Sequence, residues 1–198
     1  MKLTQAKKIV KAFAKHAARS DVRFYLRGVR FDHGKMVATD GHRLAILTSP
    51  KIASVSRALD GCTVATSPRN LEALAEILAN SNPGTEMSFD KETGVLKTHW
   101  NSFLIDNVDP QNSNFGDVRY PDYKRLIPSE ADIKASFDVF AYNAKYISDA
   151  CSLVSAVHTQ HERLHMESVN HSSGQPIAIV RIDEDGTEGM VIIMPVKL

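Results

Sequence analysis

The sequence predicts an α+β protein with mostly antiparallel sheets. The observations behind this are three amphipathic helical stripes, each followed by short runs of strand character. The stripes lie within residues 6–17, 71–78 and 147–154. Because the same helix-then-strands order appears three times, we expect an internal repeat. A chain of 198 residues can bury a substantial core in one large or two small domains.

The first predicted helix is amphipathic and basic. Apolar residues recur at helical spacing from Ala6 to Ala17, so this stripe should pack on a sheet. The cations off the stripe are Lys7, Lys8, Lys11 and Lys15. Strands are expected over 22–32, 35–40 and 43–49, with a bulge or bend at Gly28, where the apolar residues change parity.

The second and third helices carry start and stop signals. Ser67 is a predicted N-cap with Pro68 at the first helical position, and Asn82-Pro83-Gly84 ends that helix. The third helix begins near Asn143, and Asp185-Gly186 predicts a tight turn between later strands. The expected strands are 85–89, 94–99, 103–108, 163–169, 176–182 and 190–194, with a loop at 112–117 and a connection at 118–134.

Composition is that of an ordinary soluble globular protein, with 43% hydrophobic and 24% charged residues. No apolar run approaches the roughly 20 residues of a membrane helix, and the Lys-rich start lacks a signal-peptide core, so a cytoplasmic protein is expected. Cys62 and Cys151 lack metal-site spacing and are expected to be reduced, partly buried thiols.

The net charge of +1 conceals a segregation along the chain. Residues 1–35 contain ten Lys and Arg against two Asp, so the remainder is acidic. A basic segment on an otherwise acidic protein favours a polyanionic partner, although solvated surface lysines alone could produce the same pattern.

Known enzyme motifs are absent from the sequence: it has no glycine-rich phosphate loop, no Gly-x-Ser-x-Gly elbow and no paired zinc histidines with a catalytic Glu. We therefore expect no enzymatic activity and no cofactor. The best metal candidates are His158, His161, His165 and His171, which we interpret as solvated surface residues because nothing supplies tetrahedral geometry. Asp183, Glu184 and Asp185 are expected to form an acidic hairpin turn rather than a cation site.

The segment Asp40-Gly41-His42-Arg43 admits two interpretations. Acid-base catalysis by His42 beside Asp40 is one of them. A structural role is favoured, because Asp and Gly are turn residues and this segment lies between two predicted strands.

Four separated segments carry a family resemblance. They are Asp21-Val22-Arg23-Phe24-Tyr25-Leu26, Val37-Ala38-Thr39-Asp40-Gly41-His42-Arg43-Leu44-Ala45-Ile46, Tyr120-Pro121-Asp122-Tyr123-Lys124-Arg125-Leu126-Ile127-Pro128 and Met194-Pro195-Val196-Lys197-Leu198. In this order they resemble the bacterial DNA polymerase III beta sliding clamp, whose rings are built from twelve β-α-β-β-β units with helices lining the hole and antiparallel sheets outside. The resemblance implies a clamp domain at 1–130, similar to the family's middle domain, and half a clamp domain at 131–198, similar to the second half of its last domain.

The resemblance also implies two interaction sites. In the family, a surface pocket between the middle and last domains receives short peptides from replication proteins, and the helices face DNA. Carried over to this sequence, the pocket is lined by Leu26, Thr39, Gly41, His42, Arg43, Leu44, Pro121, Arg125, Leu126, Asn143, Tyr146, Pro176, Ala178, Ile192, Met194, Pro195 and Val196. The DNA-contacting residues would be Lys7, Lys8, Lys11, Lys15 and Arg19. Core packing is the alternative role for each apolar residue of the pocket.

The favoured function is that of a sliding clamp, a non-enzymatic processivity factor that encircles duplex DNA and recruits replication proteins. Three units per chain would reach twelve with four copies, so a homotetramer is expected, with a DNA polymerase and other clamp-motif proteins as partners and a clamp loader allowed. Two rivals stay open. One is a non-ring binding module acting as a decoy or adaptor for clamp-binding peptides, and the other is a metal-dependent hydrolase that uses the histidines.

Overall fold

The computed structural model describes residues 1–108, 115, 119–128, 141–158, 164–170, 176–184 and 186–196. Its helices are α1 (Leu3–Ala14), α2 (Pro50–Ala58), α3 (Pro68–Asn80) and α4 (Ala144–Val157), with 3-10 turns η1 (Phe24–Arg27) and η2 (Tyr123–Leu126). The strands are β1 (Gly28–Asp32), β2 (Lys35–Thr39), β3 (Arg43–Thr48), β4 (Thr63–Ala65), β5 (Ser88–Asp90), β6 (Val95–Lys97), β7 (Ser102–Leu104), β8 (His165–Asn170), β9 (Pro176–Glu184) and β10 (Thr187–Ile193). The predicted α+β class is confirmed.

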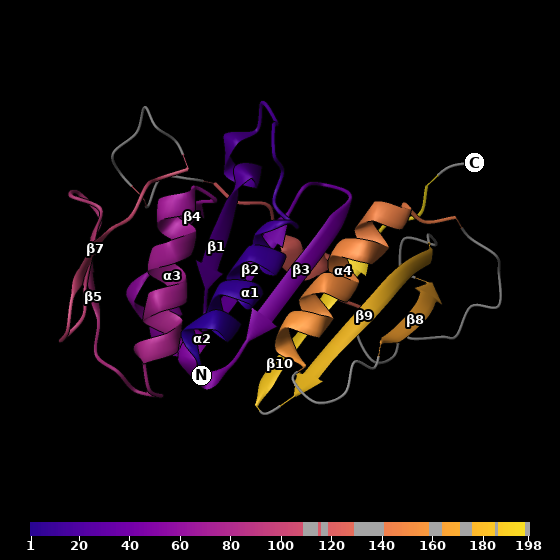
Figure 1. Cartoon of the computed structure of the whole chain (residues 1–198). Helices are drawn as coiled ribbons and strands as arrows, with labels where there is room; N and C mark the ends of the chain where they lie inside the picture. Colours follow the sequence, from indigo (N-terminus) through magenta and orange to yellow (C-terminus); the bar gives the residue numbers. More distant parts are fainter. Residues whose placement is uncertain are drawn as a thin grey trace.

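Helices cover one face of an antiparallel sheet (Figure 1). The larger sheet has seven strands in the order β4-β1-β2-β3-β10-β9-β8, and the smaller has the order β5-β6-β7. On the near face in Figure 1, α1 lies between α3 and α4. The three expected helices therefore form one layer.

The central pairing of the large sheet joins the first and third repeats. β3 pairs with β10 from Arg43 opposite Ile193 to Thr48 opposite Glu188. Strands far apart in sequence thus form one sheet, and the third repeat extends the first. The predicted domains at 1–130 and 131–198 remain a prediction, because residues 129–140 lie outside the described residues.

Local signals placed the helices correctly. Ser67 accepts a hydrogen bond from the Asn70 N–H with Pro68 at the first helical position, and Asn143 accepts from the Lys145 N–H. In α1 most of the apolar stripe is buried and Lys7, Lys8 and Lys11 are exposed, as are Lys15 and Arg19 beyond its end. These features match the prediction because capping and helical periodicity depend only on neighbouring residues.

Two predictions about the first half were wrong. The strand expected from residue 22 begins at Gly28; the residues before it form η1, and Val22 is 98% exposed. The bend expected at Gly28 is the start of β1, where an added Cβ would lie 2.7 Å from the Val64 carbonyl oxygen. Neither α2 nor β4 was predicted from the sequence, although Ser49 caps α2 by accepting from the Ile52 N–H and Pro50 occupies its first turn.

Two apolar clusters flank the large sheet. The main cluster lies between the sheet and the helices, and includes Phe13, Phe31 and Leu153. The second, the outer cluster, lies on the opposite face and consists of Val37, Leu44, Ile46, Tyr123, Val169, Ile177, Ile179 and Ile192, with Tyr120, Leu126, Ile127, Met190 and Met194 at its margin. Because η2 supplies Tyr123 and Leu126, the segment around it covers part of this outer face.

The remaining expectations concern the two cysteines, the turn before β10 and membrane-spanning helices. Cys62 is a buried free thiol and Cys151 a half-buried one, as expected. The turn before β10 is present, with Gly186 at φ 73°. Within the described ranges, none of the helices has the length and apolar character needed to cross a bilayer. The expected loop at 112–117 apart from residue 115, and His161, His171 and Asp185, lie outside the described residues.

Candidate functional site

The turn between β2 and β3 is held by the side chain of Asp40. Its Oδ1 accepts hydrogen bonds from the backbone N–H groups of His42 (3.0 Å) and Arg43 (3.1 Å), and Gly41 adopts φ 91°. Asp can close such a turn by itself, and Gly tolerates positive φ. The structural interpretation of this segment therefore fits the geometry.

Arg43 is the centre of a buried charge cluster. Its guanidinium donates from Nε to Asp40 Oδ2 (3.0 Å) and from Nη1 to Asp149 Oδ2 (2.8 Å), and Nη2 donates to the Lys15 carbonyl oxygen. Asp149 also receives a hydrogen bond from Lys145 Nζ (2.8 Å). Burial raises the pKa of Asp149, but hydrogen bonds from Lys145 and Arg43 outweigh it and hold that pKa below its usual value. The cluster thus connects α1, β3 and α4.

Asp149 belongs to a cluster that the sequence did not predict. The residue is 5% exposed and neutralised by its partners. One signal was present: Lys145 and Asp149 have the i,i+4 spacing at which helix side chains meet. The distant partner Arg43 had no such local signal.

An aromatic side chain lies against the same cluster. The Arg43 guanidinium carbon lies 4.4 Å from the centre of the Tyr146 ring, and the His42 ring stacks on Tyr146 with centroids 6.5 Å apart. A cavity of about 470 Å³ opens here. It is lined by Lys15, Ala17, Ala18, Arg19, Ser20, Asp21, Arg23, Asp40, His42, Arg43, Asn143, Lys145 and Tyr146. This polar cavity combines cations with an aromatic wall.

Apolar members of the predicted pocket gather elsewhere, in the outer cluster. Leu44 lies directly opposite Ile192 across the β3–β10 pair, and Leu126 and Met194 are half-buried at the margin of the same cluster. The Met194 N–H donates to the His42 carbonyl oxygen (3.0 Å), and the Val196 N–H to the Ala141 carbonyl oxygen (2.8 Å). Pro195 is half-buried, and Val196 and Pro121 are exposed beside this surface.

The predicted residues therefore form two groups rather than one wall. Successive strand residues point to opposite faces, so Arg43 faces the helices while Leu44 faces the outer cluster. Ala178 belongs to the helix-side core, and Leu26 is buried beside α1, where its carbonyl oxygen accepts from the Ala18 N–H. Thr39 is buried and donates to the Arg43 carbonyl oxygen, Arg125 pairs with Asp122, and Pro176 is the first residue of β9.

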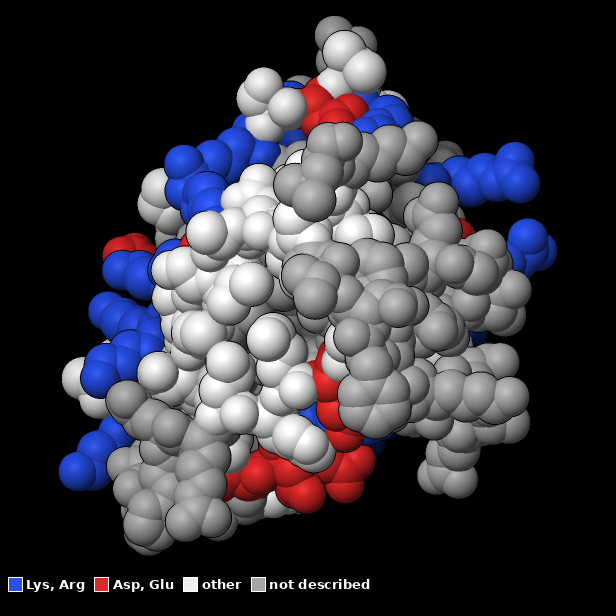
Figure 2. Space-filling view, turned by 90° about the vertical axis from the view of Figure 1, so that its right-hand side faces the viewer, with Lys and Arg blue, Asp and Glu red and all other residues white. Residues whose placement is uncertain are grey.

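The helix side carries the predicted basic surface. Figure 2 shows Lys and Arg side chains gathered along the margin where the helix layer lies. Lys7, Lys8 and Lys11 are exposed, and among the described residues they have no ion-pair partner. Lys15 differs, because its Nζ lies 3.3 Å from Ser152 Oγ and 3.9 Å from Asp149 Oδ1.

A buried histidine lies beneath this surface. His16 is fully buried, and its Nδ1 lies 3.2 Å from the Phe13 carbonyl oxygen. Burial, reinforced by the neighbouring Arg43 charge, lowers the pKa of His16 to about 4. The imidazole is therefore neutral at physiological pH.

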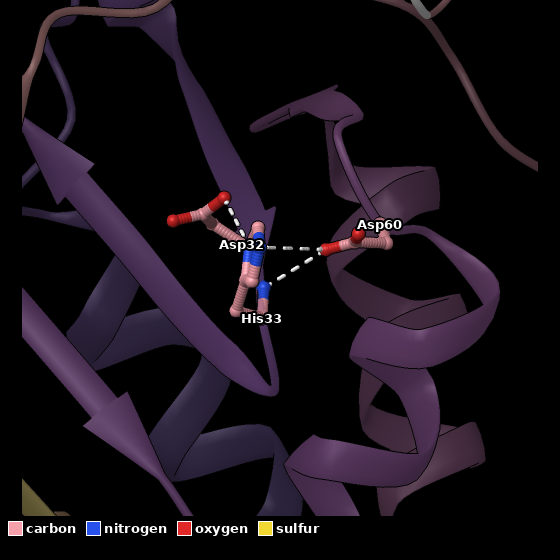
Figure 3. A group of neighbouring side chains, drawn as sticks. All are labelled: Asp32, His33 and Asp60. Atoms are coloured by element: carbon pink, nitrogen blue, oxygen red, sulfur yellow. Dashed lines mark hydrogen bonds and ion pairs between the residues drawn. The ribbon is translucent and has the colours of Figure 1, made fainter.

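Possible metal ligands are occupied by protein groups. Asp32, His33 and Asp60 converge at the β1–β2 turn (Figure 3), where His33 Nδ1 lies 2.9 Å from Asp32 Oδ1 and the backbone N–H of His33 donates to Asp60 Oδ1 (2.8 Å). Asp32 Oδ2 accepts from the Tyr123 hydroxyl (2.5 Å) and pairs with Lys124. This arrangement anchors the η2 segment to β1.

The expected surface histidines have different surroundings. His158 was expected to be solvated, but its side chain is 13% exposed and its Nδ1 lies 2.5 Å from Glu184 Oε2. His165 is exposed, as expected, and lies 3.4 Å from Glu167. Of the four predicted surface histidines, the two that the structure describes therefore contact different carboxylates.

Comparisons with known proteins identify relatives of this chain. It is 27% identical over 130 residues to the beta sliding clamp of Escherichia coli (strain K12), a match covering 64% of this chain and 32% of the relative. It is 29% identical over 140 residues to the beta sliding clamp of Salmonella typhimurium, covering 67% and 35%. The chain thus matches about a third of the length of these relatives. No protein-family model matches it.

The structural comparison agrees with the sequence comparison. A crystal structure of the DNA polymerase sliding clamp from Pseudomonas aeruginosa superimposes with a TM-score of 0.53 and 16% identity, covering 99% of this chain and 64% of the other. This chain is therefore a beta-clamp-like protein with the sliding-clamp fold.

Proposed function

We propose that this beta-clamp-like chain is a non-enzymatic processivity factor that encircles duplex DNA and recruits a DNA polymerase and other replication proteins. The observation that carries the proposal is the exposed lysine surface of α1, on the same layer as α3 and α4. A polyanion facing this layer would meet Lys7, Lys8 and Lys11 without first breaking ion pairs. The cell compartment proposed is the cytoplasm.

The charges of the neighbouring helices support helix-face binding to DNA. Asp149 of α4 is buried and paired, so it adds little negative potential to the surface, and Lys145 adds an exposed cation. The carboxylates of α3 are Glu72 and Glu76, the first exposed and the second half-buried. Attraction should therefore be strongest along α1 and the adjoining end of α4. Contacts to phosphates would hold DNA without reading sequence, as sliding requires.

A salt titration of duplex DNA binding tests this part. The variant Lys7→Ala/Lys11→Ala removes two cations that have no ion-pair partner in the described part of the chain, whereas Lys15 is excluded because it contacts Ser152 and Asp149. Affinity should fall, and the slope of log affinity against log salt should flatten by up to about 0.9 per lost phosphate contact.

The matched control is Lys91→Ala/Lys97→Ala, which removes the same charge from exposed positions around β5 and β6. Its salt slope should stay near that of the wild type. Equal losses in both double variants would contradict a DNA-facing α1 and indicate only nonspecific attraction to net charge.

We further propose that the outer cluster and the polar cavity together bind a short peptide of the clamp-binding type. Leu126 and Met194 offer half-buried apolar surface at the cluster margin, and His42 lies on the chain between the two groups. Flexible Met side chains suit binding sites that accept varied apolar residues. A Leu or Phe side chain would occupy the apolar part, while the polar cavity would orient the rest of the peptide.

Oligomeric state is the remaining element of the proposal. Three repeat units per chain complete a twelve-unit ring with four copies, so a closed homotetramer is proposed, with a clamp loader as an allowed partner. Native mass spectrometry of the full chain should show four copies. A stable monomer that still binds clamp-type peptides would instead support a non-ring adaptor or decoy.

A further inference from the structure

The two edges of the seven-stranded sheet differ in how they are covered. At one edge, β4 is bridged by Asn107 opposite Val64, and the Ala65 N–H donates to the Asp106 carbonyl oxygen (3.1 Å). At the other edge, β8 pairs only with β9 among the described residues. Every second residue of such an edge strand directs its backbone N–H and C=O away from the sheet.

Within the described residues, β8 carries few of the features that usually keep an edge strand from pairing. Protein edges are commonly protected by Lys, by Pro or by a very short strand. β8 has six residues, and none of them is Lys, Arg or Pro. Apolar surface is exposed there, since Leu164 and Met166 are 42% and 46% exposed. Figure 2, which views this side, shows uncharged side chains over the upper and central described part, an acidic patch below them and basic side chains at the margins.

The alternation of β8 limits how a second copy can pair with it. Val169 belongs to the outer cluster, so His165 and Glu167 share its face, whereas Ser168 contacts Tyr142 on the helix side and Met166 shares that face. A twofold axis perpendicular to the sheet keeps the helix layers of both copies on the same side. Residues that face each other across the interface then point to the same side of the sheet. The twofold axis must therefore pass through a residue of β8 and not between two residues.

The charged side chains of β8 distinguish the possible positions of the twofold axis. An axis at Glu167 would place two carboxylates against each other, which is unfavourable. An axis at Ser168 would place Glu167 against Val169 of the second copy. With the axis at Met166, His165 of each copy faces Glu167 of the other, and Met166 packs on Met166.

We propose that β8 pairs antiparallel with β8 of a second copy of this chain, centred on Met166, so that the large sheets of both copies become continuous. Self-complementarity of His165 and Glu167 is the argument for this occupant. In the same register Leu164 of each copy faces Ser168 of the other. This inference specifies one interface of the proposed oligomer and rests on that part of the proposed function.

Cysteine cross-linking tests the register. In a Cys151→Ser background, Met166→Cys should form a disulfide-linked dimer on mild oxidation, because opposed residues of an antiparallel pair have Cβ atoms about 4.5–5.5 Å apart. Leu164→Cys and Ser168→Cys should each stay monomeric on a denaturing gel, since a residue two positions from the axis lies roughly 13 Å from its own symmetry mate. Mixing these two variants should restore the cross-link. A disulfide in Ser168→Cys alone would overturn the register.

A charge change tests the interface without covalent chemistry. His165→Glu should leave the monomer folded, because residue 165 lies opposite Arg181 of β9, but it places Glu against Glu167 of the second copy. Self-association measured by analytical ultracentrifugation should weaken at least about tenfold. The matched control His99→Glu changes another exposed histidine and should leave self-association unchanged.

The outcomes separate this inference from the proposed function. Unchanged self-association of His165→Glu, or a wild-type chain that remains monomeric, overturns the β8 interface. Duplex DNA and peptide binding are measured on the same samples. A dimer that cross-links through Met166→Cys but binds neither DNA nor peptide supports the interface and overturns the clamp function.

Discussion

Arg43 Nη1 and Asp149 Oδ2 lie 2.8 Å apart with their side chains 4% and 7% exposed, and this ion pair joins β3 to α4. Removing one partner of a buried pair leaves the other charge desolvated. Asp149→Ala should lower the free energy of unfolding by about 3 kcal/mol. Denaturant unfolding measures it, with Asp122→Asn as control, since the Arg125–Asp122 pair is largely exposed and should change little.

The double variant Arg43→Met/Asp149→Leu completes this test. It removes both charges, so it should be more stable than Asp149→Ala alone. If the losses in the free energy of unfolding from the two single changes simply add in the double variant, the two side chains do not depend on each other.

Acid should destabilise the fold through His16. Above pH 6.5 the imidazole is neutral in both states; as pH falls from 6.5 towards 4, the unfolded chain binds a proton that the native protein does not. The free energy of unfolding should therefore decrease by up to about 3 kcal/mol across this window. His16→Gln should flatten that slope, whereas His99→Gln, at an exposed position, should not. Identical pH profiles for wild type and His16→Gln would contradict the lowered pKa.

Peptide binding should depend on the margin of the outer cluster. Leu126→Ala with Met194→Ala should weaken binding of a peptide with Gln near its start and Leu or Phe near its end by about 1–4 kcal/mol, because apolar anchors dominate such sites. Both side chains are half-buried, so the variant should fold. Calorimetry measures the loss, with Leu104→Ala on β7 as an exposed apolar control. Full affinity in the folded double variant would place the peptide elsewhere.

Gly189 should be intolerant of any side chain. An added Cβ would clash with the Ile46 carbonyl oxygen and lie 2.8 Å from Leu47 Cδ1, at the β3–β10 junction. Gly189→Ala should cost at least about 2 kcal/mol, since strand backbones must separate to admit it. Gly84→Ala is the control: it has φ 86° but no neighbour within 4 Å, so only the backbone strain of about 1 kcal/mol applies. Thermal unfolding of both variants compares them.

The helices were predictable because their signals are local. The Ser67 and Asn143 caps and the α1 stripe each involve residues within a few positions of one another. Strand boundaries were less certain: alternation at residues 22–26 resembled a strand, but this segment forms η1 after an exposed Val22. Tertiary context overrode a local pattern there.

The candidate site was predictable only in part. Family resemblance named Arg43, Leu44 and Met194, yet strand alternation directs Arg43 and Leu44 to opposite faces. The burial of Asp149 and the pairing of Asp32 with Tyr123 depend on contacts between distant segments. A single sequence carries no signal for such pairs.

The β3–β10 junction also has a consequence during synthesis. Thr48 leaves the ribosome long before Glu188, its partner in the sheet, and at ordinary translation speeds the delay is on the order of ten seconds. During that interval β3 is an apolar edge strand with no β10 beside it, and unpaired edges of this kind promote aggregation. The nascent chain would therefore depend on slow, late closure of its sheet, and chaperone demand should be concentrated in that interval.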